Sequence, residues 1–575
     1  MLKGLIQHLL GRTRADAVAT LAHAQACLRR GEYDAALAAF RQVQQAEPGL
    51  ADAWNGAGVC LRNLGRTDEA ADSFRTASRI DPGLAEAQLN LGNFAYLRGE
   101  QDAAIGYFRA FLALEPGNLA TQNVLGSLYA GQGRFAESRA CHRLVLDVDP
   151  NYLQLYSIFL LMLNFDPEVS PAEVFAEHRR WDERCARPLL AQAVVCDNQP
   201  DPERRLRIGY VSPYFVGQPV AYFVEPLLEA HDRTGFELFL YSDAAKPDEV
   251  TARLRTGADA FRETRGLDDS QLCDQVRADR IDILVDLTGH NGQNRLLAFA
   301  RRPAPLQVTY LGPNSSGMRA MDYRVTDHLV DPPGSEAQSS ERLLRLPGAQ
   351  WAYRPPVPMP EVRPLPALAR GHITFGSFNH AAKLSTPTLD MWAELMARVS
   401  GSRLHIAGVA SRAHGERLLR PFQARGIAAE RIRLVSHPGY ERYWDLYHEV
   451  DIALDSYPFN GVTTTMGCLW MGLPVVSRSG AWIASRYGAS LLGNLGAPQW
   501  VGADAAGFVD AAERLAADPA ALAQVRAGLR DRLRASTLLD GAALARKVEA
   551  AYRGIWRDWC ASRVHANMTD RSRNQ

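Results

Sequence analysis

The chain has 575 residues, with 64 Lys or Arg and 64 Asp or Glu side chains, so its formal net charge at neutral pH is zero. This balance excludes the overall basic field that attracts nucleic acids or acidic membrane surfaces. The length exceeds what one hydrophobic core usually serves, so two or three domains are expected. Only four basic residues are lysines, Lys3, Lys246, Lys383 and Lys547, and each is a candidate for a role that arginine does not fill.

The cysteines and the N-terminus indicate a compartment. The eight cysteines are scattered, with no C-x-x-C pair, which favours a reducing compartment and argues against structural zinc. The N-terminal apolar patch is interrupted at Gln7 and His8 and lacks a cleavage site, which argues against a signal peptide. No apolar run reaches the roughly 18 residues of a membrane span. The sequence therefore predicts a cytoplasmic protein with no membrane span and no nucleic-acid partner.

Residues 17–152 contain one unit four times. The copies run over 17–50, 51–84, 85–118 and 119–152, a period of 34 residues without gaps. A small residue stands at the eighth place of each unit and a ring at the twenty-fourth, as Gly58 and Phe74 do in the second. A glycine ends the first predicted helix and a proline closes each unit. This pattern resembles the tetratricopeptide repeat.

The groove of such a helical stack usually holds a protein or peptide. Asn55, Asn90 and Asn123 stand near the first helix of successive units. Their side-chain amides could clamp the backbone of an extended peptide, and the alternative is an ordinary solvated helix face. We expect an acceptor protein or peptide as the partner of the repeats.

Connecting helices are predicted over 153–204, and from there short apolar runs alternate with helical segments, as in parallel sheets covered on both faces. A proline-rich segment divides this part into two α/β lobes, 205–366 and 367–560, the second including a C-terminal helix, and 561–575 is a polar tail. Neither lobe has the glycine fingerprint of a dinucleotide site. The predicted strands are 205–212, 236–242, 281–289 and 305–312 in the first lobe and 372–379, 402–409, 431–438, 450–458 and 474–480 in the second.

Three threonines, Thr463, Thr464 and Thr465, follow the predicted strand 450–458 and an Asn-Gly turn and begin a helix. The first turn of a helix has unpaired N–H groups and a partial positive charge, so it binds anions. Hydroxyl groups there add donors suited to a diphosphate. The alternative is a simple N-cap at Thr463, which would explain one threonine only.

Four motifs carry a resemblance to a known family: "VDLTGH", "RRPAPLQVTYLGPNSSGMRAMDY", "GSFNHAAKLSTPTLDMW" and "NGVTTTMGCLWMGLPVV". In this order they resemble the catalytic region of the O-GlcNAc transferase family, which joins tetratricopeptide repeats to a two-lobed GT-B glycosyltransferase. The resemblance implies an α-solenoid followed by two Rossmann-like α/β lobes. It also implies transfer of GlcNAc from UDP-GlcNAc to Ser or Thr of proteins, with inversion, and with no metal and no cofactor beyond the UDP-sugar.

The resemblance also implies roles for individual residues. Lys383 matches the lysine that neutralises the departing diphosphate, as a cation must where no metal does so. Asp286 and His290 match catalytic polar residues near the sugar and acceptor, and the alternatives for them are a strand-end cap and a core histidine. The general base stays open between them, a water and a donor phosphate oxygen. The donor-binding matches are Asn379, His380, Pro438, Tyr440, Tyr443, Asn460, Gly461, Thr463, Thr464 and Thr465. Gln218 and Pro219 match the acceptor and sugar side.

Some matched positions depart from the family pattern. Gln218 stands where a histidine is common, and glutamine does not accept a proton. Val462, Tyr443 and Gly467 stand where His, His and Asp are frequent, and the loss of that Asp removes about 1–2 kcal/mol of ribose binding. Two alternatives follow: the same fold with another nucleotide sugar, as in flagellin or surface-protein glycosylation, or a repeat scaffold whose transferase domain is catalytically impaired.

Overall fold

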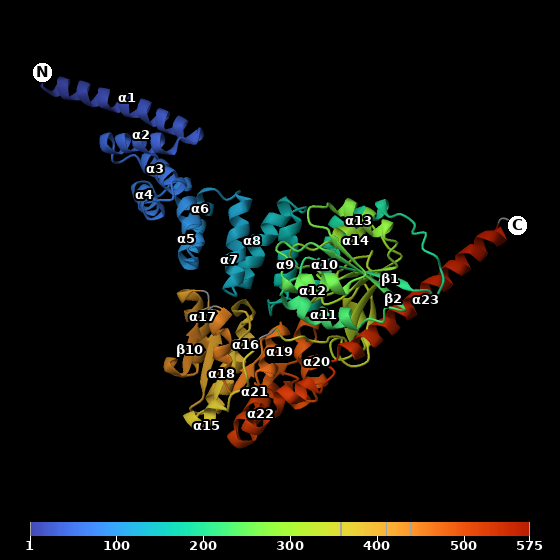
Figure 1. Cartoon of the computed structure of the whole chain (residues 1–575). Helices are drawn as coiled ribbons and strands as arrows, with labels where there is room; N and C mark the ends of the chain where they lie inside the picture. Colours follow the sequence, from blue (N-terminus) through green and yellow to red (C-terminus); the bar gives the residue numbers. More distant parts are fainter. Residues whose placement is uncertain (1, 357–358, 410, 437–439, 574–575) are drawn as a thin grey trace. The chain divides into compact units, whose positions relative to one another are not determined.

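The computed structural model describes the backbone of residues 2–356, 359–409, 411–436 and 440–573, and the side chains of 16–356, 359–409, 411–436 and 443–563. The chain forms two compact units (Figure 1). The first consists of Met1–Tyr129, Ala140–Val145 and Ser411–Ala413, and the second of Ala130–Arg139, Leu146–Ala410 and His414–Gln575. No helix within the described ranges combines the length and apolar character that crossing a membrane requires.

The repeats form consecutive pairs of helices, as predicted. Their bounds are α1 (Leu2–Arg29), α2 (Tyr33–Ala46), α3 (Ala51–Asn63), α4 (Thr67–Ile80), α5 (Ala85–Leu97), α6 (Gln101–Leu114), α7 (Leu119–Gly131) and α8 (Phe135–Val148). The first helix begins at Leu2, well before the start of the predicted first unit.

Glycine and ring positions explain how these helices approach one another. A β-carbon on Gly58 would lie 2.6 Å from the ring of Phe74, which belongs to the same repeat. One on Gly56 would lie 2.2 Å from Phe40 of the preceding repeat. Because no side chain fits there, the rings fill the space both within a pair and between pairs. Gly65 follows α3 with φ +76°, the left-handed conformation that ends a helix.

Two of the three asparagines on the repeats interact with each other. The side-chain amide of Asn90 donates a hydrogen bond to Asn55 Oδ1 at 3.0 Å and accepts one from Arg62 at 3.1 Å. Part of their hydrogen-bonding capacity is therefore used between successive repeats, and a clamp on peptide backbone stays a prediction.

The second unit begins with the predicted connecting helices. These are α9 (Leu153–Leu163) and α10 (Pro171–Trp181), followed by the short turns η1 (Asp182–Ala186) and η2 (Arg187–Gln192). At the start of α10 the Ser170 hydroxyl accepts a hydrogen bond from the N–H of Glu173 at 3.3 Å, and the Glu173 carboxylate accepts one from the N–H of Ser170 at 2.7 Å. This reciprocal capping box fixes where the helix starts.

The first lobe contains a seven-stranded parallel sheet in the order β3-β2-β1-β4-β5-β6-β7. Its strands are β1 (Leu206–Ser212), β2 (Phe236–Ser242), β3 (Ala260–Glu263), β4 (Ile283–Asp286), β5 (Leu306–Thr309), β6 (Tyr323–Asp327) and β7 (Arg342–Leu346). The intervening segments include α11 (Pro219–Ala230), α12 (Glu249–Gly257), α13 (Asp269–Ala278), α14 (Leu296–Ala300) and η3 (Ser335–Gln338). The switch from β1 to β4 at the middle of the order is typical of a doubly wound fold.

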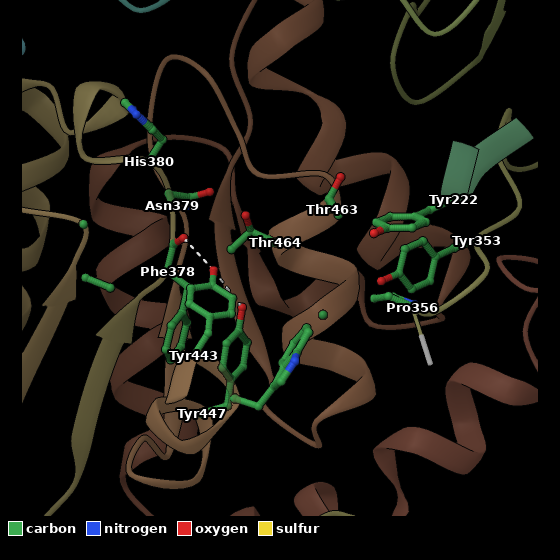
Figure 2. A pocket seen from close by; sticks show the side chains of 14 residues that line it. Tyr222, Tyr353, Pro356, Phe378, Asn379, His380, Tyr443, Tyr447, Thr463 and Thr464 are labelled. Atoms are coloured by element: carbon green, nitrogen blue, oxygen red, sulfur yellow. Dashed lines mark hydrogen bonds between the residues drawn. The ribbon is translucent and has the colours of Figure 1, made fainter. Parts of the chain in front are cut away.

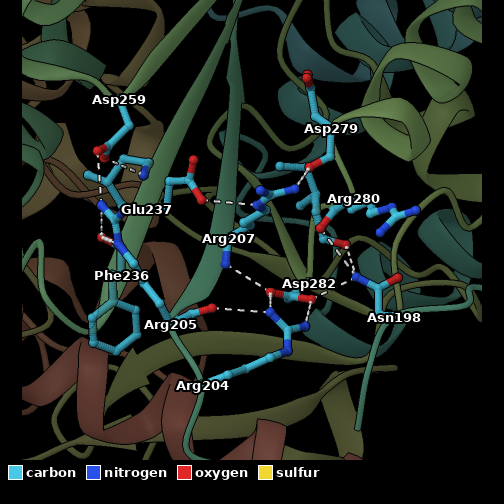
Figure 3. A network of polar contacts seen from close by, with 12 residues as sticks. Asn198, Arg204, Arg205, Arg207, Phe236, Glu237, Asp259, Asp279, Arg280 and Asp282 are labelled. Atoms are coloured by element: carbon cyan, nitrogen blue, oxygen red, sulfur yellow. Dashed lines mark hydrogen bonds and ion pairs between the residues drawn. The ribbon is translucent and has the colours of Figure 1, made fainter. Parts of the chain in front are cut away.

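A network of ion pairs closes the amino-terminal edge of this sheet (Figure 3). The Asp282 carboxylate accepts hydrogen bonds from Arg204 at 2.9 Å, from Asn198 at 2.7 Å and from the backbone N–H of Arg207 at 2.8 Å. The Arg207 guanidinium in turn lies 3.0 Å from the carboxylate of Glu237. The arginines at this edge of the sheet therefore form ion pairs with carboxylates of the same lobe, which neutralise their positive charges.

The second lobe contains a six-stranded parallel sheet in the order β10-β9-β8-β11-β12-β13. Its strands are β8 (Thr374–Ser377), β9 (Arg403–Ala407), β10 (Ile432–Val435), β11 (Ile452–Leu454), β12 (Val475–Arg478) and β13 (Val501–Gly502). Its helices are α15 (Pro366–Arg370), η4 (Ala381–Lys383), α16 (Thr386–Arg398), α17 (Arg412–Ala424), η5 (Ala429–Arg431), α18 (Tyr440–His448), α19 (Thr463–Trp470), η6 (Ile483–Ser485), α20 (Tyr487–Asn494), η7 (Pro498–Trp500), α21 (Ala505–Ala516) and α22 (Pro519–Arg534).

The last helix, α23 (Gly541–Arg573), does not pack where the sequence placed it. The sequence assigned it to the second lobe, because it follows that lobe in the chain. Its apolar residues Val548, Tyr552 and Trp556 are instead buried in the core of the first lobe, beside the first-lobe strands. The chain therefore crosses back from the second lobe to the first.

Candidate active site

Asp455 stands one residue beyond the buried strand β11 and organises the loop that follows. One carboxylate oxygen accepts hydrogen bonds from the N–H groups of Gly461 at 2.7 Å and Ser456 at 2.9 Å, and from the Asn379 amide at 3.1 Å. The other oxygen accepts one from the Ser477 hydroxyl at 2.7 Å. Burial raises the pKa of Asp455, and these donors oppose that rise. The carboxylate thus fixes the loop to residues at the ends of three neighbouring strands.

A cavity of about 380 Å³ lies at the carboxyl ends of the second-lobe strands. Figure 2 shows Tyr222 and Tyr353 on one side of it and Phe378, Tyr443 and Tyr447 on another. Its lining consists of Tyr222, Tyr353, Pro356, Phe378, Asn379, His380, Ala407, Gly408, Tyr443, Trp444, Tyr447, Thr463, Thr464 and Gly467. Because Tyr222 belongs to α11, both lobes contribute to the cavity, as ligand sites of this fold class usually require.

The threonines divide between this cavity and the loop. Val462 is the N-cap of α19 and no side chain caps the helix, so the simple capping alternative for Thr463 is wrong. Thr463 and Thr464 line the cavity. Thr465 is buried, and its hydroxyl donates a hydrogen bond to the carbonyl of Gly461 at 3.0 Å. Two hydroxyls and the positive end of the helix therefore face the cavity, and the third hydroxyl supports the loop.

Lys383 brings a buried cation to the same loop. Its Nζ donates a hydrogen bond to the carbonyl of Asn460 at 3.1 Å, three residues before α19, and lies 4.0 Å from the centre of the Phe459 ring. Burial lowers the pKa of Lys383 from its ordinary value of 10.5 to about 8, while the charge of Asp455 opposes that decrease. The Phe459 ring is itself packed edge-on against Phe165 of the connecting segment, with centroids 5.0 Å apart.

The other predicted phosphate-side residues have mixed roles. Asn379 lines the cavity, although its amide is held by Asp455. His380 also lines the cavity, and its Nδ1 accepts a hydrogen bond from the N–H of Ala382 at 3.2 Å. Asn460 is fully buried, and its amide donates to the carbonyl of Ser456 at 2.8 Å. Its side chain is therefore structural, and its carbonyl is what reaches Lys383.

An aromatic wall forms one side of the cavity, and the sequence identified only one of its members. The Phe378 and Tyr447 rings stack with centroids 3.8 Å apart, and the Tyr447 hydroxyl donates to the Tyr443 hydroxyl at 3.2 Å. Burial raises the pKa of both tyrosines, so they stay neutral. The one-turn spacing of Tyr443 and Tyr447 on α18 was the available signal. Such a wall suits an aromatic base.

Gly467 leaves space at this wall. A β-carbon there would lie 3.7 Å from the Tyr447 hydroxyl and 3.8 Å from Trp444, both ordinary contact distances. A larger side chain is therefore not excluded by crowding at the first atom. Of the two remaining predicted base contacts, Pro438 lies outside the described residues, and Tyr440 starts α18 without a described side chain.

Asp286 and His290 are not among the residues that line this cavity, and the catalytic roles predicted for them stay predictions. The Asp286 carboxylate accepts hydrogen bonds from the N–H groups of Thr288 at 3.0 Å and Gly289 at 2.9 Å and from the Thr309 hydroxyl at 3.0 Å. Burial raises its pKa to about 6. It caps the end of β4, which was the alternative reading of a strand-end carboxylate.

His290 is packed between aromatic side chains of α10. Its ring centroid lies 4.9 Å from His178 and 4.6 Å from Trp181, and its Nε2 is 2.7 Å from the carbonyl of Ser316. Burial, and then the nearby His178, lower its pKa to about 3. A group of this kind is neutral near pH 7. On the acceptor side, Gln218 and Pro219 are exposed at the start of α11, next to Tyr222 but outside the lining.

Among the described side chains, no group of three or more His, Cys, Asp or Glu residues is arranged to hold a metal ion. Thr463 and Thr464 line the cavity at the start of α19, and the Lys383 amine, which is not itself in the lining, bonds to the loop that leads into that helix.

Sequence comparison identifies two families in the chain. The model of glycosyl transferase family 41 matches residues 191–352 and 361–548, and a tetratricopeptide-repeat model matches residues 21–85. Two plant proteins, from Petunia hybrida and Arabidopsis thaliana, are each 36% identical to the chain over 72% of it. Both are described as probable UDP-N-acetylglucosamine–peptide N-acetylglucosaminyltransferase SPINDLY. The matched part makes up 45% and 46% of those proteins, so the chain spans about half of their length.

A solved structure matches almost the whole chain. It is a lysine-to-methionine mutant of the O-GlcNAc transferase of Thermobaculum terrenum, 35% identical, with a TM-score of 0.71, and it covers 96% of this chain and 99% of its own. The match confirms the predicted order of a repeat solenoid followed by two GT-B lobes. With the family model covering both lobes, the chain belongs to glycosyl transferase family 41.

Proposed function

We propose that this protein is an inverting, metal-independent O-glycosyltransferase that transfers GlcNAc from UDP-GlcNAc to Ser or Thr hydroxyls of a protein. The observation that carries the proposal is that the Lys383 amine bonds to the loop leading into α19, whose first residues Thr463 and Thr464 line the interlobe cavity. The names of the plant relatives and of the matched bacterial structure support the choice of donor and acceptor.

The leaving group determines the chemistry at this loop. When the acceptor hydroxyl attacks the anomeric carbon, the bond from that carbon to the diphosphate oxygen breaks, and UDP departs with an additional negative charge. The Lys383 ammonium, the hydroxyls of Thr463 and Thr464 and the N–H groups of α19 would stabilise that charge. Asp455 fixes the loop that precedes α19 through the N–H of Gly461, so little reorganisation of that loop is needed at the reacting step.

The aromatic wall would hold the nucleoside. The stacked rings of Phe378 and Tyr447 offer a flat apolar face in the same cavity that Thr463 and Thr464 line. The repeats would bind the acceptor protein, as helical stacks of this kind usually do.

The fate of the hydroxyl proton also follows from the site. Asp286 accepts three hydrogen bonds from its neighbours and does not line the cavity, and burial lowers the pKa of His290 to about 3, which makes it a weak base. A donor phosphate oxygen or a water remains as the acceptor of that proton. We propose that Asp286 and His290 position the first-lobe loop instead.

The lining favours a second candidate, the same reaction with another nucleotide sugar. Among the described side chains that line the cavity there is no Asp or Glu, and Gly467 occupies the place of the carboxylate that the family often uses for ribose. The choice between donors is therefore an experimental one.

Intact-mass spectrometry of a co-expressed acceptor protein tests the proposal. The mass increment identifies the sugar, and Lys383→Met should abolish it, whereas the matched control Lys246→Met, at an exposed lysine of the first lobe, should not. A thermal-shift screen with UDP-, GDP- and CMP-sugars gives the donor preference independently. Stabilisation by none of them, together with no mass increment on any acceptor, would support the scaffold alternative and refute the proposal.

A further inference from the structure

A second polar cavity lies at the opposite, amino-terminal edge of the second-lobe sheet. It has a volume of about 500 Å³ and includes Thr374, the first residue of β8, and Arg403, the first residue of β9. The active-site cavity stands at the carboxyl ends of the same strands. The two cavities share no lining residue.

The sequence of these strands is unusual for a covered parallel sheet. Such strands normally read as continuous apolar runs. Here β9 reads Arg-Leu-His-Ile-Ala and β10 reads Ile-Arg-Leu-Val, so polar side chains alternate with apolar ones. Arg433 pairs in register with His405, and Thr374 pairs with Arg403, which places all four on one face of the sheet. That face is built for polar contacts.

The cavity has an excess of positive charge. Four guanidinium groups line it against two carboxylates, so two positive charges are uncompensated when the two histidines are neutral; the lining is Arg370, His372, Thr374, Arg403, His405, Glu430, Arg431, Arg433 and Glu449. Arg433 forms an ion pair with Glu449, and Arg431 donates to backbone carbonyls, one of them Ser402 at 2.7 Å. Arg403 is exposed, and the described residues give its guanidinium no hydrogen bond and no ion pair.

Two buried polar atoms in the lining also lack hydrogen bonds among the described residues. Thr374 is 1% exposed, and its Oγ1 has no partner. His405 Nδ1 is buried without a hydrogen bond, and the nearest carboxylate oxygen, on Glu449, is 3.7 Å away. Buried polar atoms in folded proteins are nearly always hydrogen-bonded, so each of these atoms requires an explanation.

The corresponding edge of the first lobe shows the usual solution. There Arg204 and Arg207 meet the carboxylates of Asp282 and Glu237 directly (Figure 3). In the second lobe the arginines surround open space, and a hydroxyl and an imidazole nitrogen are left unpaired beside it.

We propose that this cavity is a binding site for a small phosphate-bearing anion, separate from the active site. Guanidinium groups bind phosphate oxygens in a forked, charge-assisted geometry. The guanidinium group of Arg403 would bind two phosphate oxygens, and the Thr374 hydroxyl would donate a hydrogen bond to the phosphate. Arg433 would bind the phosphate either in place of its ion pair with Glu449 or in addition to it. The phosphate would satisfy the unpaired groups and offset the excess charge.

Calorimetric titration of the full-length protein tests the proposal, with pyrophosphate as the probe and UDP present throughout to occupy the other anion site. Arg403→Gln combined with Arg433→Gln should weaken pyrophosphate binding at least about tenfold, since each charge-assisted hydrogen bond contributes that much. Thr374→Val removes one donor without a change of shape and should weaken it severalfold. Arg514→Gln, at an exposed arginine of α21 outside the cavity, is the matched control and should change nothing.

The source of the phosphate is distinguished by a second series with inorganic phosphate and glycerol phosphate. Tighter binding of glycerol phosphate indicates that the ligand is a phosphorylated metabolite, and tighter binding of the inorganic ions indicates free phosphate. Either result supports the proposed site if the Arg403 variants no longer bind the same ligand. Arg403→Gln alone keeps the test valid if the Arg433 change lowers stability. No binding to the wild-type protein at millimolar concentrations, or equal binding by wild type and the Arg403 variants, overturns the proposal, and neither result bears on the transferase activity.

Discussion

Replacing Lys383 with methionine should move two properties of the protein in opposite directions. The pKa of this lysine falls from 10.5 to about 8 in the folded protein because its ammonium is buried. Each tenfold change in proton affinity corresponds to about 1.36 kcal/mol, so holding the charged amine at neutral pH costs the fold about 3 kcal/mol. Methionine has a similar length and no charge, and the ligand-free variant should be more stable by up to about that amount.

The pH dependence fixes the sign of this effect. The folded-state pKa lies below the unfolded value, so the unfolded chain binds more protons between about pH 8 and pH 10.5. The cost is therefore fully present below pH 8, and the stability of the wild-type protein recovers as the pH rises through that window. Chemical denaturation of both proteins at pH 7 and pH 10 should show a gap that narrows at the higher pH.

The same variant should lose catalysis. A charge about 4 Å from a diphosphate oxygen is worth up to ~4 kcal/mol at an effective dielectric constant of ~20, and removing one such group typically lowers turnover by 10²–10³-fold. Turnover is measured by acceptor mass after timed reaction, with Lys246→Met as the control. A Lys383→Met protein that is less stable than wild type at pH 7 without ligand, or that turns over at the wild-type rate, would refute the electrostatic reasoning.

Three further predictions address the surroundings of this lysine. Phe459→Leu removes the ring beside the Lys383 ammonium, so the pH near 8 at which turnover falls should decrease by about 0.5–1 unit. Phe459→Tyr keeps a ring there and should restore the wild-type pH profile. An unchanged profile in Phe459→Leu would exclude the cation–π contribution. Gly467→Asp should tighten UDP binding by calorimetry about tenfold through a hydrogen bond to ribose, and the same gain with Gly467→Asn would show that charge is not involved. His290→Gln should lower the free energy of unfolding by about 1–3 kcal/mol. The pH dependence of turnover between pH 5 and 8 should keep its shape, because this imidazole is already neutral there. Loss of the decrease in turnover at acidic pH in this variant would show instead that His290 carries a proton in the reaction.

The repeats and most strands were predictable because their signals are local. The period of 34 residues, and glycines such as Gly65, follow from packing that recurs in every unit. Strands buried on both faces, such as β1 and β11, appear as apolar runs. The strands that the sequence reading did not name, β3, β6, β7 and β13, are short, half-exposed or charged: β7 reads Arg-Leu-Leu-Arg-Leu at the sheet edge. Their pairing depends on neighbours distant in sequence.

The candidate site divides in the same way. Lys383 and the threonines stood out by rarity and by position at a helix start, and the structure brings them to one loop. The sequence does not predict in which direction a side chain points. Thr465 and Asn460 point into the loop, and His290 packs against aromatic side chains of α10. The sequence did not single out Asp455, whose carboxylate holds the loop before α19 through the N–H of Gly461.

The scarcity of lysine gives the buried Lys383 amine a practical consequence. With a pKa of about 8, a larger fraction of it is deprotonated near neutrality than of an exposed lysine, and only three other lysine side chains compete for an amine-selective reagent. Small acylating reagents should therefore label this position at a rate that reports whether the diphosphate loop is vacant or occupied. The chain thus contains its own chemical reporter of donor occupancy.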